Sequence, residues 1–486
     1  MVCFRRVVDT FFFFFESHLP FLCEYIDSGE IVWYNIVKFC EEVNSVKHKT
    51  FKSISLSALV LAILLIFSSC VEHHVHSFGE WSADNSSSCI VDGTEIRKCS
   101  CGETETRTAP AKNHDFDNGA CKNCGARPSE GLEFKSNGDG TCTFVGRGTC
   151  TDAEIIFPTK SPAGDTLTKL MGGRFFGDEV LTAVYIPETV IDISVDFVAV
   201  CPTIACINVS EDNTVYSSVG GVLYNKDGTT LIKYPEAKNA VSFDIPATVT
   251  TIATGAFMGA ENLTSISIPE SVTTIEMSAF QSCSGLTAIS IPAGVTTIAS
   301  GTFASCISLK SISLPDTITA MENDVFSHCE SLKSFTVPKG VTTIPESAFY
   351  SCKELTEVVL HDGVTTIGPK AFYLCTALKQ ITLPASVARI YERAFLSCTS
   401  LESIILPDGV KTIYTSTFQN CPALASVTIP SSVEKIEEYA FSECKALSSI
   451  VFKGTKSQWE SVKTKGNWRS FVPATGVTCS DGTLEF

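Results

Sequence analysis

The sequence predicts a mainly β protein, built as a solenoid of short parallel strands with a small Cys-rich module ahead of it. Three columns of identical residues recur with a period of 23. Phe occupies positions 257, 280, 303, 326, 349, 372, 395, 418 and 441. Cys follows at 283, 306, 329, 352, 375, 398, 421 and 444, and Leu at 263, 286, 309, 332, 355, 378, 401, 424 and 447. Internal periods of about 20–50 residues indicate stacked repeats.

Each repeat reads LxxIxIPxxVxxIxxxAFxxCxx. The IxI alternation indicates a short strand whose large side chains point inward. The Pro that follows ends the strand, because it lacks the amide that a sheet ladder needs. The VxxI segment predicts a second short strand, and AFxxC turns the chain back. One coil cannot bury its Leu, Ile and Phe alone, whereas coils stacked about 4.8 Å apart bury a continuous column.

The N-terminal region contains a secretory signal pattern. Residues 46–69 have a basic start, an apolar run and a small-residue end before Cys70, and the apolar run is shorter than the ~20 residues of a membrane span. We expect lipid attachment at Cys70, because IFSSC resembles a lipoprotein processing site, although Phe67 departs from it. We expect residues 1–45 to be a mis-started extension; the alternative is a genuine extension followed by an internal anchor.

The exported chain divides by composition and pattern. We expect a Cys/His-rich module at 70–128, a short β lead-in at 129–164 and a C-terminal cap at 452–486. The repeats should span 165–451, with an excursion at 210–243 that interrupts the stack. NGDG and NKDG, at 137–140 and 225–228, are typical hairpin turns.

The repeats resemble the BspA-like leucine-rich repeats of bacterial and protozoan surface proteins. The resemblance rests on the 23-residue LxxIxIPxxVTTIxxxAFxxC unit and covers roughly residues 165–451. It implies a right-handed solenoid at the cell surface, held by a lipid anchor, that serves adhesion or protein binding. Members of the family have been associated with host matrix proteins, so the resemblance also implies a protein partner of that kind.

The eight repeating cysteines are expected to be buried free thiols. A catalytic thiol needs a base and an electropositive setting, and eight equivalent nucleophiles have no mechanistic use. Adjacent coils would place Cα atoms within disulfide range, but side chains in register point the same way. Disulfides between coils remain the alternative.

A second group of cysteines has metal-ligand spacing. Cys99, Cys101, Cys121 and Cys124 form a C-x-C-G and a C-x-x-C-G pair, close to the pattern of zinc ribbons. His76, Cys89 and His114 are near enough in sequence to complete a site. A structural zinc ion, disulfides and inert thiols all remain open here.

The outward position of the predicted strand reads Ser267, Ser290, Ser313, Thr336, Val359, Thr382, Ile405 and Thr428. A Ser/Thr column is typical of a solvated strand face. Val359 and Ile405 depart from it with apolar side chains that could contact a partner, and solenoids present their concave strand surface for such binding.

Composition and motifs narrow the function. The net charge of −17 disfavours nucleic-acid binding, and the sequence contains no nucleophile elbow, P-loop, zinc-protease or dinucleotide motif. We therefore expect no enzymatic activity, and we expect a cell-surface or outer-membrane protein that binds a partner across the strand face. The alternatives are a structural envelope protein without a dedicated ligand and, less favoured, an enzyme with its site in the 70–150 module.

Overall fold

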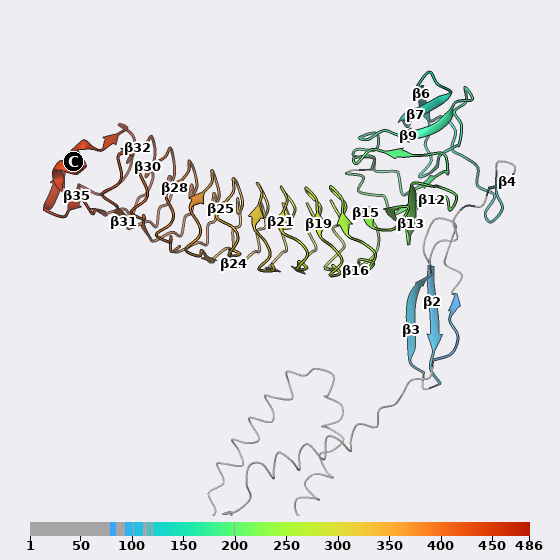
Figure 1. The fold of residues 1–486 in the computed structure, drawn as a ribbon, viewed down its shortest axis with the longest axis horizontal. Coiled ribbons are helices and arrows are strands. Elements are labelled where there is room, and N and C mark those ends of the chain that lie inside the picture. Colours follow the sequence, from blue (N-terminus) through green and yellow to red (C-terminus); the bar gives the residue numbers. More distant parts are fainter. Residues whose placement is uncertain are drawn as a thin grey trace, which may run out of the picture. The chain divides into compact units, whose positions relative to one another are not determined.

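The computed structural model describes residues 78–83, 93–100, 102–109, 114, 116–117, 120–198 and 200–486. The expected extension at 1–45, the signal segment at 46–69, Cys70, His76, Cys89 and Cys101 lie outside these residues. Within the described part of the chain, no helix is long and apolar enough to cross a membrane. The compact unit that contains these residues runs from Phe78 to Phe486 and is almost entirely β (Figure 1).

Short antiparallel pairs make up the described part of the Cys-rich module. One sheet has the order β1-β2-β3 and a separate pair joins β4 to β5. The bounds are β1 (Ser82–Ala83), β2 (Gly93–Lys98), β3 (Thr104–Ala109), β4 (Phe116–Asp117) and β5 (Ala120–Cys121).

The repeats form a stack of coils with two columns of parallel strands. The first column arises from the IxI segments and consists of β8 (Glu154–Ile156), β10 (Ala183–Ile186), β12 (Cys206–Val209), β16 (Ser242–Asp244), β18 (Ser265–Ser267), β20 (Ala288–Ser290), β22 (Ser311–Ser313), β24 (Ser334–Thr336), β26 (Glu357–Val359), β29 (Ser403–Ile405), β31 (Ser426–Ile429) and β33 (Ser449–Phe452). Paired residues are offset by 23, as in Ser334 opposite Glu357, except between β8 and β10, where Ala183 lies opposite Glu154. The predicted parallel solenoid is therefore confirmed.

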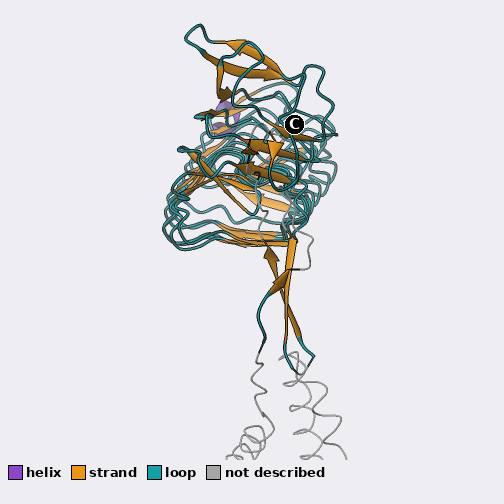
Figure 2. Cartoon of the chain, turned by 90° about the vertical axis from the view of Figure 1, so that its right-hand side faces the viewer, coloured by secondary structure: helices purple, strands orange, loops and turns teal. Residues whose placement is uncertain are grey.

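The second column arises from the VTTI segments. It consists of β9 (Thr166–Leu170), β11 (Asp192–Ile193), β15 (Thr230–Lys233), β17 (Thr251–Ile252), β19 (Thr274–Ile275), β21 (Thr297–Ile298), β23 (Ala320–Met321), β25 (Thr343–Ile344), β27 (Thr366–Ile367), β28 (Arg389–Ile390), β30 (Thr412–Ile413), β32 (Lys435–Ile436) and β34 (Lys463–Thr464). Most of these strands have only two residues. Each therefore pairs with the strands of the neighbouring coils over a short distance, and loops separate it from the rest of its own coil. Seen from the side in Figure 2, the coils overlay one another with their strands in bands.

The stack begins earlier than the expected boundary at residue 165. A hairpin of β6 (Glu133–Ser136) and β7 (Thr141–Gly146) turns at the NGDG segment, as predicted. β7 then pairs in parallel with β9, and β8 with β10. The lead-in thus already supplies strands to both columns. Ile155 and Pro158 fit the repeat, but Asp152 stands in the Leu position and the next Pro, Pro187, follows after 29 residues in place of 23, so the repeat pattern does not reveal this coil.

Phe side chains form the centre of the array. Consecutive rings from Phe257 to Phe441 are stacked with centroids 5.1–5.7 Å apart and interplanar angles of 3–18°. Ring separations in this range are favourable for aromatic pairs. Parallel coils place residues of the same repeat position above one another. The rings can therefore stack only if Phe recurs every 23 residues.

The expected excursion at 210–243 is a junction between two cores. β13 (Tyr216–Val219) and β14 (Val222–Asn225) form a hairpin, and β14 pairs with β15 through the NKDG turn. Side chains alternate along β14: Leu223 packs in the core of the early coils, whereas Val222 and Tyr224 pack in the core of the later ones. Successive strand residues point to opposite faces, so one strand joins both cores.

The excursion also ends earlier than expected. β15 pairs in parallel with β17, and β16 pairs in parallel with β18. Residues 230–244 therefore belong to the array. Tyr234 lies 23 residues before Phe257 and stacks on it at 5.3 Å, so it occupies the Phe position of this coil. Tyr in place of Phe, and Ala237 in place of Cys, conceal the repeat.

Tyr234→Phe is expected to stabilise the protein. The Tyr234 ring is fully buried, burial raises the pKa of its hydroxyl, and that hydroxyl has no hydrogen-bond partner among the described residues. Removing an unsatisfied buried hydroxyl should raise the free energy of unfolding by about 1–3 kcal/mol. Urea denaturation measures this. Tyr216→Phe is the control with the opposite sign, because the Tyr216 hydroxyl accepts a hydrogen bond from the Ile193 amide at 3.0 Å.

The C-terminal end of the array is closed by a different structure. The helix α5 (Lys456–Ser461) starts at a capping box of Thr455 and Gln458 and buries Trp459. β35 (Gly476–Cys479) continues the first column and turns back into β36 (Gly482–Glu485). Trp468 meets Phe441 edge-on at 6.0 Å. A perpendicular indole ends the stack of parallel rings and shields its last face from water.

Candidate functional site

The first strand column presents an outward row of small side chains, which we call the strand face. It comprises Ser265, Ser267, Ala288, Ser290, Ser311, Ser313, Ser334, Thr336, Glu357, Val359, Ser403, Ile405, Ser426 and Thr428. Each is exposed or half-buried, while the residue between each pair points into the core or against it. Glu357 is the charged member of the set. Period-two alternation thus produces a flat, nearly uncharged surface along the strands.

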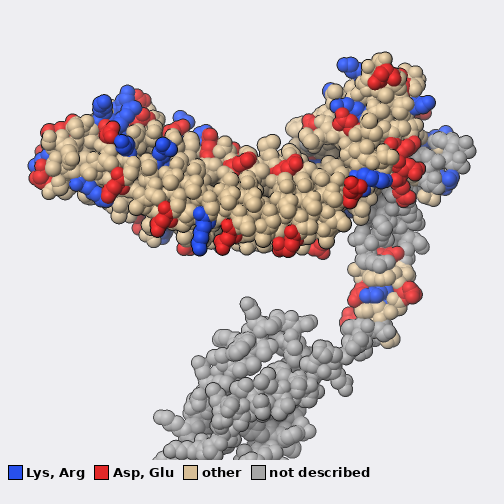
Figure 3. All heavy atoms as spheres, in the orientation of Figure 1, with Lys and Arg blue, Asp and Glu red and all other residues tan. Residues whose placement is uncertain are grey.

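Val359 and Ile405 lie on this surface as the sequence predicts. Val359, on β26, is 45% exposed and Ile405, on β29, is 64% exposed. Thr382 is exposed in the coil between them, but the structure assigns no strand at 380–383. The two apolar side chains therefore belong to separate short sheets. Figure 3 shows charged side chains scattered along the array with broad areas of other residues between them.

One shallow depression lies on the strand face. Ala288, Ser290, Ser311 and Ser313 line it, with Ile266, Ile289 and Ile312 below. Its floor is apolar, and three of the four residues around it are serines. The depression does not include Val359 or Ile405, so the two features are separate parts of one surface.

The eight repeating cysteines are buried free thiols that form a hydrogen-bond ladder. Each Sγ donates to the carbonyl oxygen of the Phe in the preceding coil, 26 residues earlier, at 3.0–3.2 Å. Burial raises the pKa of Cys352 above the ordinary value of a thiol and that of Cys306 to about 12. Thiols of this kind are unreactive. The sequence predicted their burial but not their role as donors between coils.

Cys352→Ala is expected to lower the free energy of unfolding by about 1–2 kcal/mol, because it opens a small cavity and removes the thiol donor to Phe326. Partner binding should remain unchanged, since Cys352 is fully buried. Chemical denaturation and a binding assay measure the two effects. Lys353→Ala is the matched control at an exposed neighbour, with an expected change below about 0.5 kcal/mol. Loss of binding by a folded Cys352→Ala protein would contradict this assignment.

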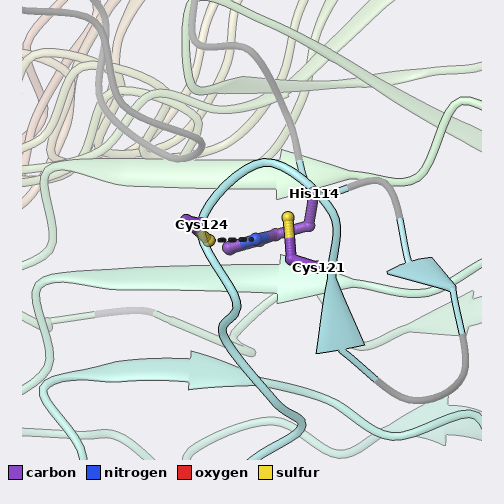
Figure 4. Close-up of side chains that lie close together, drawn as sticks. All are labelled: His114, Cys121 and Cys124. Carbon is purple, nitrogen blue, oxygen red and sulfur yellow. Dashed lines mark hydrogen bonds between the residues drawn. The ribbon is translucent and has the colours of Figure 1, made fainter.

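A second set of polar side chains gathers in the Cys-rich module. One nitrogen of His114 and the Sγ atoms of Cys121 and Cys124 all lie within 4.8 Å of one another. Cys124 Sγ is 3.4 Å from His114 Nδ1 (Figure 4). His114 and Cys121 are buried, whereas Cys124 is exposed. The structure therefore brings together two of the four predicted metal-ligating cysteines with a histidine that lies close to them in sequence.

The other predicted ligands are not part of this cluster. Cys99 is buried at the end of β2, where it forms an isolated bridge with Phe78. It does not join His114, Cys121 and Cys124 in the group of possible ligands found among the described residues. Cys101 and Cys70 lie outside those residues. The spacing C-x-x-C-G identified Cys121 and Cys124, and the tertiary structure selected His114 as their neighbour.

The sequence profile described as "BspA type Leucine rich repeat region" matches residues 234–356 and 342–462. Residues 234–462 of the array form a BspA-type leucine-rich repeat region. The matched residues begin at Tyr234, the position at which the structure shows the Phe column starting. The matched residues include β16 to β33 and all of the strand face.

Solved structures provide further similarities. A leucine-rich cell surface protein from Faecalibacterium prausnitzii A2-165 is 28% identical, with 70% of this chain and 99% of that chain covered and a TM-score of 0.42. A leucine-rich repeat protein from Bacteroides ovatus ATCC 8483 is 24% identical over 69% and 98%, with a TM-score of 0.42. One from Eubacterium ventriosum ATCC 27560 is 23% identical over 65% and 93%, with a TM-score of 0.36. No curated protein sequence matches the chain.

Proposed function

We propose that this chain is a cell-surface protein that recognises a protein partner through the strand face of its BspA-type repeats. The observation that carries the proposal is the strand face itself: a row of small, mostly uncharged outward side chains, carried by several short sheets, that includes exposed Val359 and Ile405. Repeat arrays use extended surfaces of this kind for binding. The partner we expect is a protein, such as a host matrix protein or another surface protein.

The chemistry of the strand face suits a protein surface. Small side chains allow another chain to approach closely, and serine and threonine hydroxyls both donate and accept hydrogen bonds. Interface cores are depleted in charged residues, and the strand face carries Glu357 as its charged member. Val359 and Ile405 would supply apolar contacts within this polar surround.

Surface attachment is the second part of the proposal. We expect export through residues 46–69 and lipid attachment at Cys70, which together would keep the array at the cell surface or outer membrane. Cys70→Ala is expected to release the protein into the soluble fraction, and mass spectrometry of the native N-terminus would detect the lipid. An unmodified Cys70 in a membrane-bound protein would overturn this part alone.

The binding proposal is tested with the full chain and a panel of purified matrix proteins by surface plasmon resonance. Saturable binding is expected to at least one of them. The double variant Val359→Lys/Ile405→Lys should weaken it roughly tenfold or more, since desolvated apolar contacts dominate interface energy. Met277→Lys/Ile307→Lys is the matched control, because both residues are exposed but lie outside the strands. Absence of saturable binding, or equal losses in both double variants, would overturn the proposal.

The evenness of the strand face supports one alternative. Serine, threonine or alanine occupies most of its positions with little variation, as expected of an envelope protein that binds no dedicated ligand. Such a protein should bind none of the panel, and the face variants should leave its cell-surface level unchanged. Protease treatment of intact cells separates the two locations, because a surface array is cleaved and an internal one is protected.

A further inference from the structure

We propose that His114, Cys121 and Cys124 bind a zinc ion that fastens residues 114–126 to the flank of the solenoid. This site is independent of the strand face. It follows from three observations: the spacing of the ligand atoms, the backbone that presents the two cysteines, and the contacts between this segment and β10.

The ligand atoms have the separation that a tetrahedral metal requires. Zinc binds sulfur at about 2.3 Å and imidazole nitrogen at about 2.0–2.1 Å. A tetrahedron with those bonds places nitrogen about 3.5 Å from sulfur and the two sulfurs about 3.8 Å apart. Cys124 Sγ and His114 Nδ1 are 3.4 Å apart, and all three ligand atoms lie within 4.8 Å of one another. In Figure 4 the imidazole ring lies beside both sulfur atoms.

The backbone of this segment is a tight turn around the sulfurs. The Gly125 amide donates to the Cys121 carbonyl at 2.7 Å, and the Cys121 amide donates to the Ala126 carbonyl at 2.8 Å. Gly125 has φ +75°, a conformation that glycine adopts without strain. Turns of this kind hold two cysteines of a C-x-x-C pair on one side of the chain, where both can bind one ion.

The chain builds a similar turn, one residue shorter, at Cys99. Phe78 pairs with Cys99 as Phe116 pairs with Cys121. The Gly102 amide donates to the Cys99 carbonyl at 3.0 Å, the Cys99 amide donates to the Glu103 carbonyl at 2.8 Å, and Gly102 has φ +98°. Both phenylalanines belong to a His-x-Phe sequence. In both turns a Gly with positive φ donates to the carbonyl of the first cysteine and that cysteine's amide donates to the residue after the Gly. The zinc proposal concerns the turn at Cys121, whose three ligands are described.

The site is built against the solenoid. The Tyr185 hydroxyl, on β10, donates to the His114 carbonyl at 3.2 Å, and the two rings meet edge-on with centroids 5.2 Å apart. Cys121 packs with Ala183 on β10 and Cys206 on β12. His114 and Cys121 thus have protein on one side, while exposed Cys124 leaves the other side open for a fourth ligand.

The donor set favours zinc over other divalent cations. Two thiolates and an imidazole are soft or borderline ligands, which suit zinc and disfavour magnesium and calcium. Two thiolate charges would neutralise the ion, so the buried group would carry no net charge. Bound zinc would hold Cys121, Cys124 and His114 together. The contacts between His114 and Tyr185 would then attach this group to β10.

Metal analysis of the full chain, purified without a metal-affinity step, tests the proposal. Cys121→Ser/Cys124→Ser and His114→Ala should each lower the zinc content by roughly one equivalent per chain. Lys122→Ala, an exposed residue inside the same turn, is the matched control and should retain it. Cobalt substitution should give thiolate-to-metal charge-transfer absorption that disappears in the cysteine variant. Circular dichroism confirms that the solenoid of each variant is folded.

A second measurement uses the unmodified protein. Chelation should speed proteolysis between residues 110 and 128 in the native protein, and should have no further effect on the Cys121→Ser/Cys124→Ser variant. Unchanged zinc content in that variant would overturn the proposal. A Cys121–Cys124 disulfide, found by mass spectrometry of non-reduced peptides from metal-replete protein, would overturn it as well.

Discussion

Replacing Glu236 with alanine is expected to lower the free energy of unfolding by about 3–5 kcal/mol. Lys233 Nζ lies 3.4 Å from Glu236 Oε1 and 3.1 Å from the Met258 carbonyl, and both side chains of the pair are under 10% exposed. Burial lowers the pKa of Lys233, while Glu236 opposes that shift. Without Glu236, the ammonium would remain buried with its carboxylate partner missing. Equilibrium denaturation in urea measures the loss.

Two further variants separate this effect from a general loss of charge. Glu434→Ala removes a carboxylate whose partner, Lys411, is 3.6 Å away with both side chains 73% exposed, so the expected cost is below about 1 kcal/mol. Lys233→Met/Glu236→Leu removes both buried charges and should recover much of the stability, because apolar replacement of a buried pair is often neutral or favourable. A Glu236→Ala protein as stable as the unmodified chain would show that the pair is not buried in solution.

Replacing Phe349 with alanine is expected to cost about 3–5 kcal/mol. Its ring is fully buried and stacks between Phe326 at 5.6 Å and Phe372 at 5.3 Å, with Phe335 edge-on at 4.9 Å. Alanine would leave a cavity in the middle of the ring stack. Because the stability of a repeat array depends on contacts between neighbouring coils, the damage should also be local.

Hydrogen exchange tests where the damage occurs. Amide protection should fall most in the coils that contain Phe326 and Phe372, and least near Trp468. Phe471→Ala is the control, since this aromatic side chain is 73% exposed and its loss should change stability by less than about 0.5 kcal/mol. Equal loss of protection along the whole array would contradict nearest-neighbour coupling and indicate one cooperative core.

The repeat period predicted most of the fold because it states a packing requirement. The Phe, Cys and Leu columns recur every 23 residues, and the structure places all three inside the stack. The outward positions followed from alternation, so Val359 and Ile405 were placed correctly. What the period could not show was the hydrogen bond from each thiol to the Phe carbonyl of the coil before it, because a periodic sequence does not reveal which atoms meet.

The prediction of where the coils begin and end was weakest where other residues replace the Phe, Leu and Cys of the repeat. Residues 210–243 were expected to interrupt the stack, but β14 within them is buried and joins two cores. Tyr234 holds a Phe position, and the substitution hid the coil that follows the hairpin. Pairing of β7 and β8 with later coils was missed for the same reason. In each case, contacts between residues far apart in the sequence determined the structure. The spacing of residues within one coil contains little information about such contacts.

In the Cys-rich module, too, the sequence predicted one part of the site and the tertiary structure determined the rest. C-x-x-C-G spacing identified Cys121 and Cys124 as candidate ligands, while the four-cysteine grouping with Cys99 is not the one the described residues form. The histidine beside the two sulfurs was one of several candidates in the sequence. Its selection depends on β4 and β5 pairing and on the contact with Tyr185, which lies 71 residues away.

By itself, the sequence determined the coil: its length, its inward Phe, Leu, Ile and Cys, and the small outward residues of the strand face. These follow from the 23-residue period, since a parallel stack buries only what recurs in register. The tertiary structure alone decided where the array begins, how β14 joins its two cores, and which histidine meets Cys121 and Cys124. Those features depend on contacts between segments that are not related by the repeat, and such contacts form only when the whole chain has folded.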